Sequence, residues 1–167
     1  LLRDKLNRSD LSTNLKIATS GPRRKAQLLG INSGFHIVPI RGNIQTRIDK
    51  MTTEKLDGLV VAKAALNRLK ISHPNIYIFS EEEMLPAAAQ GAIGIEVIKE
   101  NIETKTNNLL ESINDNLTFE ATEIERTVVA ALQGNCLSPI SALCKIRDQN
   151  VELKVRVSNQ KGSEVYD

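Results

Sequence analysis

Short apolar runs alternate with amphipathic segments along the first 70 residues of the chain. Apolar runs rich in β-branched residues predict strands at residues 16–19, 36–40 and 59–62. Each run is followed by a stretch with helical spacing of its apolar residues, at 23–29, 44–51 and 64–70. Strands and helices that alternate with short links are typical of βαβ units on a parallel sheet. We therefore expect an α/β fold.

The pattern changes in the second half of the chain. The runs 76–79 (IYIF) and 92–98 predict two more strands, and the glutamates at 81–83 indicate the start of a solvent-facing helix. Beyond Lys99, polar-faced helices are expected at 100–113 and 117–132, and alternating strands at 138–146 and 151–158 joined by the turn RDQN. These patterns predict an α/β ligand-binding domain over 1–98, a connecting segment with a helix over 99–117, and the start of a small α+β domain over 118–167.

Arginines follow the predicted strands at the turns into the helices. Pro22 suits a first helical position, and Arg23 and Arg24 come directly after it. Arg41 ends the second apolar run, Asn43 is a suitable helix cap, and Arg47 lies about one turn further on. Because the carboxyl ends of parallel strands meet at one edge, these arginines should share a rim with free helix N–H groups. Such a rim favours carboxylates or phosphates.

Composition narrows the class of ligand. Seven of the ten arginines fall in the first 70 residues, yet the net charge is only +2, 3% of residues are aromatic and Trp is absent. Nucleic acid is therefore a poor candidate partner, since no stacking platform accompanies the basic residues. No apolar run approaches the length of about 20 residues that a membrane span needs. His36 and His73 do not pair at metal-ligand spacing, so no metal is expected.

The cysteines and the chain ends bear on the cellular location of the protein and on its full length. Cys136 and Cys144 do not make a secreted disulfide framework, which favours a reducing, cytoplasmic location. The chain lacks an initiator Met, and its last residues come just after a predicted strand. We expect it to be part of a longer protein.

Four motifs occur in the order and spacing of a known family. They are ATSGPRR at 18–24, IRGNIQTRIDK at 40–50, LPAAAQGAIGIE at 85–96 and ERTVVAALQGNCLSPISA at 125–142, with DGLVVAKAALNRL at 57–69 between them. Together they resemble hydroxymethylbilane synthase, also called porphobilinogen deaminase. The resemblance implies a monomeric three-domain transferase of tetrapyrrole and haem biosynthesis, whose first two domains are similar to periplasmic binding proteins. Such an enzyme joins four porphobilinogen units head to tail and releases ammonia each time.

The resemblance also assigns roles to individual residues. It implies a dipyrromethane cofactor attached by a thioether to Cys136, formed by thiolate addition to an electrophilic methylene-pyrrolenine. The residues implied in cofactor binding are Thr19, Ser20, Arg23, Arg24 and Arg47; those implied in binding porphobilinogen and the growing polypyrrole are Arg41, Arg47, Arg68 and Gln90. The catalytic aspartate of the family belongs to an N-terminal domain that has no counterpart here, so no catalytic residue is assigned and the chain alone should not turn over.

Several positions depart from the family pattern. Gly21-Pro22 stands where Ser-Leu is common, Lys63 replaces a small residue, Ala131 an arginine, and Asn135 and Ser141 glycines. These changes affect the geometry of the cofactor loop more than the attachment itself.

Plainer interpretations remain for the same residues. A lone cysteine is commonly a buried inert thiol, which is the interpretation we adopt for Cys144, and paired arginines commonly form a solvated helix face. Gln90 is equally suited to stabilising a turn. The alternative function is a non-catalytic binding module for a small polycarboxylate or phosphate.

Overall fold

The computed structural model describes residues 1–2, 11, 14–98, 103–148 and 150–167. Its N-terminal part contains a three-stranded parallel sheet in the order β2-β1-β3, formed by β1 (Lys16–Ala18), β2 (His36–Val38) and β3 (Gly58–Leu59). In the register, Ile17 lies opposite Ile37 on one side and Gly58 on the other. The predicted α/β class and the parallel sheet are confirmed, although each strand is shorter than its apolar run.

Three helices connect and follow these strands: α1 (Pro22–Ile31), α2 (Ile44–Thr53) and α3 (Lys63–Arg68). Pro22 occupies the first turn of α1, where a missing N–H costs nothing. The Asn43 side chain accepts a hydrogen bond of 2.8 Å from the backbone N–H of Thr46 and caps α2. Both predicted helix starts are confirmed.

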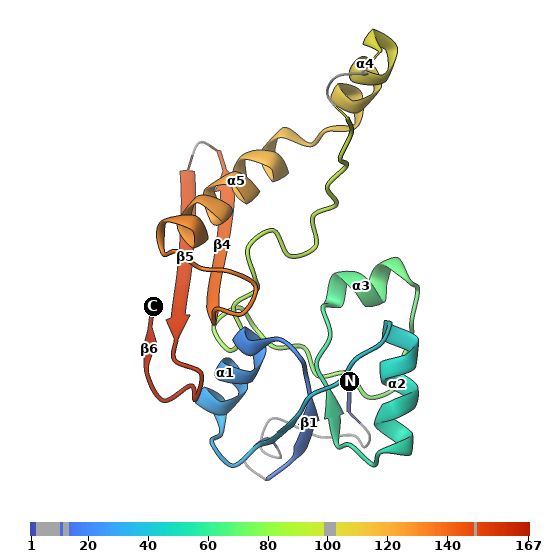
Figure 1. The fold of residues 1–167 in the computed structure, drawn as a ribbon, viewed down its shortest axis with the longest axis vertical. Helices are drawn as coiled ribbons and strands as arrows, with labels where there is room; N and C mark the ends of the chain where they lie inside the picture. The colour runs from blue at the N-terminus through green and yellow to red at the C-terminus, as the bar shows by residue number, and fades with distance from the viewer. Residues whose placement is uncertain (3–10, 12–13, 99–102, 149) are drawn as a thin grey trace.

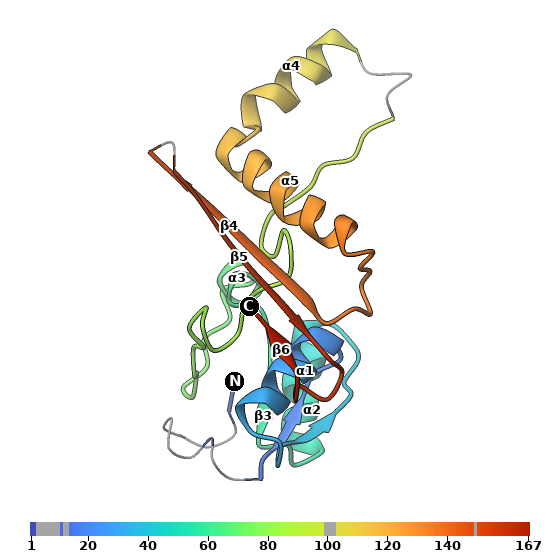
Figure 2. The ribbon, with the colours of Figure 1, turned by 90° about the vertical axis from the view of Figure 1, so that its left-hand side faces the viewer.

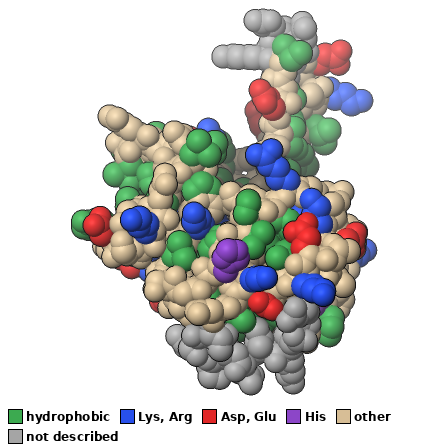
Figure 3. Space-filling model, turned by 60° about the horizontal axis from the view of Figure 1, so that its bottom comes forward, with side chains coloured by type: hydrophobic (Ala, Val, Ile, Leu, Met, Phe, Trp, Pro, Cys, Tyr) green, Lys and Arg blue, Asp and Glu red, His purple; other side chains and the backbone are tan. Residues whose placement is uncertain are grey.

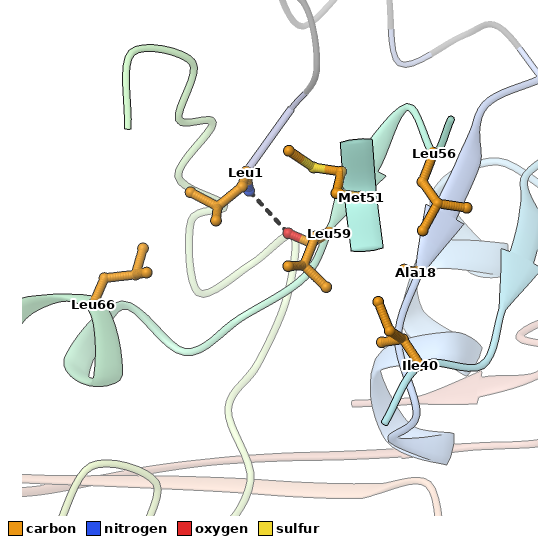
Figure 4. Close-up of a cluster of buried hydrophobic side chains, with 7 residues drawn as sticks. All are labelled: Leu1, Ala18, Ile40, Met51, Leu56, Leu59 and Leu66. Carbon is orange, nitrogen blue, oxygen red and sulfur yellow. Dashed lines mark hydrogen bonds between the residues drawn. The ribbon is translucent and has the colours of Figure 1, made fainter. Parts of the chain in front are cut away.

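The central strand separates two apolar clusters because successive residues of a strand point to opposite faces. Ala18 faces Met51 of α2 together with Leu59 and other residues on that side. Figure 4 shows this cluster, with the Leu1 amino group bonded to the carbonyl of Leu59 at 2.9 Å. Ile17 faces the other way and packs with Leu28 of α1. The sheet is thereby covered on both faces.

Two predicted strands are absent. Residues 76–79 are not in a strand, although Tyr77 and Phe79 pack edge to face at 5.0 Å between ring centroids. Residues 92–98 are also irregular, with Ile93 72% and Ile98 71% exposed. An apolar run becomes a strand only when it joins the ladder of a neighbouring strand, and neither run belongs to one of the two sheets of the described residues.

The C-terminal part is an antiparallel ribbon covered by a helix. Its elements are α4 (Thr104–Ile113), α5 (Asn116–Ala131), β4 (Ile140–Arg147), β5 (Asn150–Ser158) and β6 (Val165–Tyr166), with the strands in the order β4-β5-β6. The two helices and the hairpin are confirmed; the first residues of the predicted 100–113 helix and one residue of the hairpin turn lie outside the described residues. In Figures 1 and 2, α5 lies along β4, while α4 projects away from the rest of the molecule.

The glutamate run at 81–83 is not the start of a helix, contrary to the prediction. It forms a turn that contacts the ribbon: the carboxylate of Glu81 lies 2.5 Å from Lys145 Nζ, and that of Glu82 lies 3.1 Å from Lys154 Nζ. Glu83 accepts hydrogen bonds from the Tyr77 hydroxyl and the Ser80 N–H. Glu81 and Glu82 therefore join the two parts of the chain. Within the described residues, no helix is long and apolar enough to cross a membrane.

Candidate functional site: arginines beside a cysteine loop

Arg23 is a buried charge in the first turn of α1. Only 9% of the residue is exposed. Its Nη1 donates to the Leu85 carbonyl at 2.6 Å, and its Nη2 donates to Gln90 Oε1 at 3.2 Å. Burial, followed by the neighbouring charge of Arg24, lowers the pKa of Arg23 to about 10. At neutral pH the guanidinium still carries its full charge.

Arg24 contacts the same amide and lies close to a third arginine. Its Nη2 donates to Gln90 Oε1 at 3.3 Å. Burial first, and then the positive charge of Arg47, lowers its pKa below the ordinary arginine value. Arg47 itself donates from Nε to the Gly42 carbonyl at 2.7 Å, which holds it against the turn before α2. Helices α1 and α2 thus bring like charges together.

No carboxylate compensates this positive charge within the ranges that the structure describes. Every oxygen that accepts from Arg23, Arg24, Arg47 or Arg68 belongs to a backbone carbonyl or to the Gln90 amide. Removing charged groups from water without an opposite charge is costly. An anionic ligand would supply the missing compensation, and carboxylates match the guanidinium fork.

Cys136 lies beside these arginines on an exposed loop. A cavity of about 390 Å³ is lined by Arg23, Arg24, Gln90 and Cys136, among other residues. Asn135 shapes the loop, since its Oδ1 accepts from the Leu137 N–H at 2.8 Å and its own N–H donates to Ser138 Oγ at 3.1 Å. Exposure of Cys136 and burial of Cys144 both agree with the expectations.

A second cavity of about 470 Å³ adjoins the first through Gly21 and Pro22, which line both. Its wall includes Thr19, Ser20, Arg41 and Leu137, the residue after the exposed cysteine. The Ser20 hydroxyl is engaged with the backbone of Ile40. Thr19 Oγ1, by contrast, is buried and has no hydrogen-bond partner among the described residues, although buried hydroxyls are normally paired.

Arg68 and Arg47, the remaining predicted binding residues, lie outside the two cavities. Arg68 is exposed and donates to the Gly91 carbonyl at 3.2 Å, next to Gln90. Lys63, one of the departures from the family pattern, lines a third cavity of about 230 Å³ together with Arg23, Arg24 and Gln90. The lysine adds a cation there.

Two buried polar residues that the sequence analysis missed hold this site together. Gln27, one turn after Arg23, donates to the Leu85 carbonyl and to Ser141 Oγ, and accepts from the Leu85 N–H at 2.7 Å. Glu125 accepts from the N–H of Ala89 at 2.6 Å and from that of Cys144 at 2.8 Å. Both link the segment that contacts Arg23 to strand β4. The helical spacing of Arg23 and Gln27 was the available signal.

Charges of both signs lie on the face drawn in Figure 3, where Lys and Arg side chains are interspersed with Asp and Glu.

A parallel sheet with helices on both faces and uncompensated arginines at its carboxyl edge defines an anion-binding α/β protein. The family model described as "Porphobilinogen deaminase, dipyromethane cofactor binding domain" matches residues 1–106, and the model of the porphobilinogen deaminase C-terminal domain matches 119–167. The chain therefore belongs to the porphobilinogen deaminase family, as the motifs predicted.

Curated relatives agree with this assignment. The chain is 38% identical to the porphobilinogen deaminase of Clostridium novyi (strain NT), over 99% of the chain and 56% of the relative. It is 42% identical to that of Clostridium acetobutylicum, over 86% of the chain and 48% of the relative, and 41% identical to that of Clostridium botulinum (strain 657), over 87% and 49%. The chain spans about half the length of the curated relatives it matches.

Proposed function

We propose that the chain supplies the arginine rim and the cofactor cysteine of a porphobilinogen deaminase. This transferase joins four porphobilinogen units head to tail and releases one ammonia for each. The observation that carries the proposal is that Arg23, Arg24 and Cys136 line one cavity while neither arginine has an acid partner among the described residues. The alternative of a non-catalytic binding module is not favoured, because the family models and the relatives all indicate a deaminase.

The residues around the cavities fit a dipyrromethane. Each pyrrole of this group carries two carboxylates, so the ligand is a compact polyanion that several guanidinium groups can compensate. Thr19, whose Oγ1 has no hydrogen-bond partner among the described residues, precedes Gly21 and Pro22 in the chain, and the half-buried Arg24 follows them. Cys136 is the exposed thiol beside them. We infer that Thr19, Ser20, Arg23, Arg24 and Arg47 hold the cofactor, with a thioether from Cys136.

The chain's own residues would bind and align the reactants. The bound dipyrromethane would supply the pyrrole position on which the product is extended. Arg41 and Arg68 would bind carboxylates of porphobilinogen and of the growing chain, and Gln90 lies at the same rim, against Arg23 and Arg24. Fixing two pyrroles by their side chains converts the coupling into a nearly intramolecular step. Proton transfer requires an acid or base, and we assign it to an aspartate of an N-terminal domain like that of the longer relatives. We further propose a monomer that acts in the cytoplasm.

The test uses the complete encoded protein and compares its two cysteines. The intact mass of the purified protein should exceed the sequence mass by a dipyrromethane, and porphobilinogen should release ammonia. Cys136→Ser should lose both the added mass and the turnover, because the thioether has no other attachment point. Cys144→Ser is the matched control and should keep both, since Cys144 is buried away from the cavity. An unmodified wild-type mass together with no ammonia release would contradict the proposal.

A further inference from the structure

We propose that the side chain of Gln90 stands in for a ligand carboxylate and is displaced when one binds. The inference rests on the proposed function only in that Arg23 and Arg24 bind carboxylates. It turns Gln90 from a ligand contact, the role implied by the family resemblance, into a competitor of the ligand. In this role Gln90 regulates access to the arginines.

The first argument is geometric. One atom, Gln90 Oε1, accepts from Arg23 Nη2 at 3.2 Å and from Arg24 Nη2 at 3.3 Å. An amide oxygen has the shape and the lone pairs of one carboxylate oxygen but carries no net charge. It therefore occupies the point between two guanidinium groups where a carboxylate oxygen would be bound.

The second argument is energetic. Both distances are long compared with the roughly 2.7–2.9 Å of charge-assisted bonds between guanidinium and carboxylate. Arg23 keeps its separate 2.6 Å bond to the Leu85 carbonyl, so it stays anchored when the amide leaves. A carboxylate in the same place would form shorter bonds and would compensate the positive charge. Displacement of the amide is therefore favourable.

The third argument concerns what can move. The backbone on either side of Gln90 is held, because the N–H of Ala89 donates to Glu125 at 2.6 Å and the carbonyl of Gly91 accepts from Arg68 at 3.2 Å. Ala89 and Gly91 both have positive φ, at 56° and 99°, which fixes a tight local path. Gln90 itself is exposed. Rotation of its side chain thus needs no rearrangement of the backbone.

Space for the displaced side chain is available. Gln90, Arg23 and Arg24 line the cavity that contains Cys136 and also the cavity of about 230 Å³ that contains Lys63 and Tyr77. The glutamine therefore stands between two cavities. An incoming carboxylate on the cysteine side can push the amide toward the other side, where Tyr77 and Lys63 offer polar surroundings.

The test measures succinate affinity by calorimetry in the complete encoded protein carrying Cys136→Ser, so that no covalent cofactor competes. Gln90→Ala and Gln90→Asn should bind succinate about threefold more tightly, because the competing hydrogen bonds are lost. Gln90→Glu should bind it about tenfold more weakly, because a charged stand-in is harder to displace. Gln133→Glu, at an exposed position in the turn after α5, is the charge-matched control and should bind like its parent.

The diagnostic result is tighter succinate binding by Gln90→Ala and Gln90→Asn together with weaker binding by Gln90→Glu. A merely structural or ligand-contacting glutamine would weaken binding in all three variants. Equal or weaker binding by Gln90→Ala and Gln90→Asn, or no succinate binding by the parent, overturns the inference. Ammonia release from porphobilinogen by the protein with Cys136 intact tests the proposed function separately. If the protein releases no ammonia but its Gln90 variants bind succinate as expected, the proposed function is refuted and the inference about Gln90 stands. If it releases ammonia but the Gln90 variants do not bind as expected, the inference is refuted and the proposed function stands.

Discussion

The two parts of the molecule treat their cations differently. In the C-terminal ribbon, Lys145 pairs with Glu81 at 2.5 Å, Lys154 with Glu82 at 3.1 Å, and Arg156 with both oxygens of Asp167 at 2.5 and 2.7 Å. On the rim of the parallel sheet, Arg23 and Arg24 donate only to neutral oxygens within the part of the chain that the structure describes.

The pKa values follow this difference. The hydrogen bond that Arg156 donates to Asp167 raises the pKa of Arg156 above the ordinary arginine value, whereas burial lowers the pKa of Arg23 to about 10. An arginine that is paired with an acid contributes to the stability of the folded state. A buried arginine without such a partner lowers the stability of the ligand-free protein, and a bound anion would compensate its charge. Cationic side chains that pair with a carboxylate of the protein thus stabilise the fold, whereas those without such a partner are available to bind a ligand.

The largest expected effect comes from exchanging arginine for lysine in both parts. Arg23→Lys should lower the affinity of the Cys136→Ser protein for succinate about 1,000-fold, because lysine cannot keep the Leu85 carbonyl and bind a carboxylate with a fork, at roughly 2 kcal/mol for each lost bond to a charged group. Arg156→Lys is the matched control, which should lower the melting temperature and leave affinity unchanged. Calorimetry and thermal unfolding measure the two quantities. Equal losses of affinity in both variants would remove the distinction between the two kinds of cation.

The second largest expected effect is a loss of stability when Glu125, which joins the N-terminal part to the ribbon, is removed. Glu125→Ala should reduce the free energy of unfolding by about 3 kcal/mol, because the buried N–H groups of Ala89 and Cys144 lose their acceptor. Glu120→Ala, at an exposed position of the same helix, should change it by less than about 0.5 kcal/mol. Denaturant titration measures both. An unchanged stability of Glu125→Ala would show that the junction does not depend on this carboxylate.

The smallest effect is the pH dependence of the ribbon's own pairing. The hydrogen bond from Arg156 lowers the pKa of Asp167 below its ordinary value of 3.8. The ionised carboxylate therefore stabilises the fold fully above that value, and the contribution is lost as the pH falls through the lower folded pKa. Because the carboxylate is partly exposed, the effect should stay below about 1 kcal/mol. The melting temperatures of wild type and Asp167→Asn should differ at pH 7 and converge on acidification; a constant gap would rule out this linkage.

Local patterns were sufficient for elements whose stability is local. Pro22 and Asn43 place the starts of α1 and α2 because a missing N–H and a capping oxygen act within one turn. The alternation in β4 and β5 predicts the hairpin because its partner strand is adjacent in sequence. The same reasoning fails at 76–79 and 92–98, where the apolar runs join neither sheet of the described residues. It also fails at 81–83, where the ribbon captures the glutamates in a turn.

Motifs and periodicity are properties of the chain, and they were enough to assign the family, the succession of parallel βαβ units and the residue types at the rim. The placement of Arg23 in one cavity with Cys136, and the burial of Gln27 and Glu125 between the two parts, follow from the three-dimensional fold. It also decided which cations lack an acid partner. The physical reason is that burial and charge compensation depend on groups more than 50 residues apart, such as Arg23 and Leu85, whose meeting no local pattern encodes.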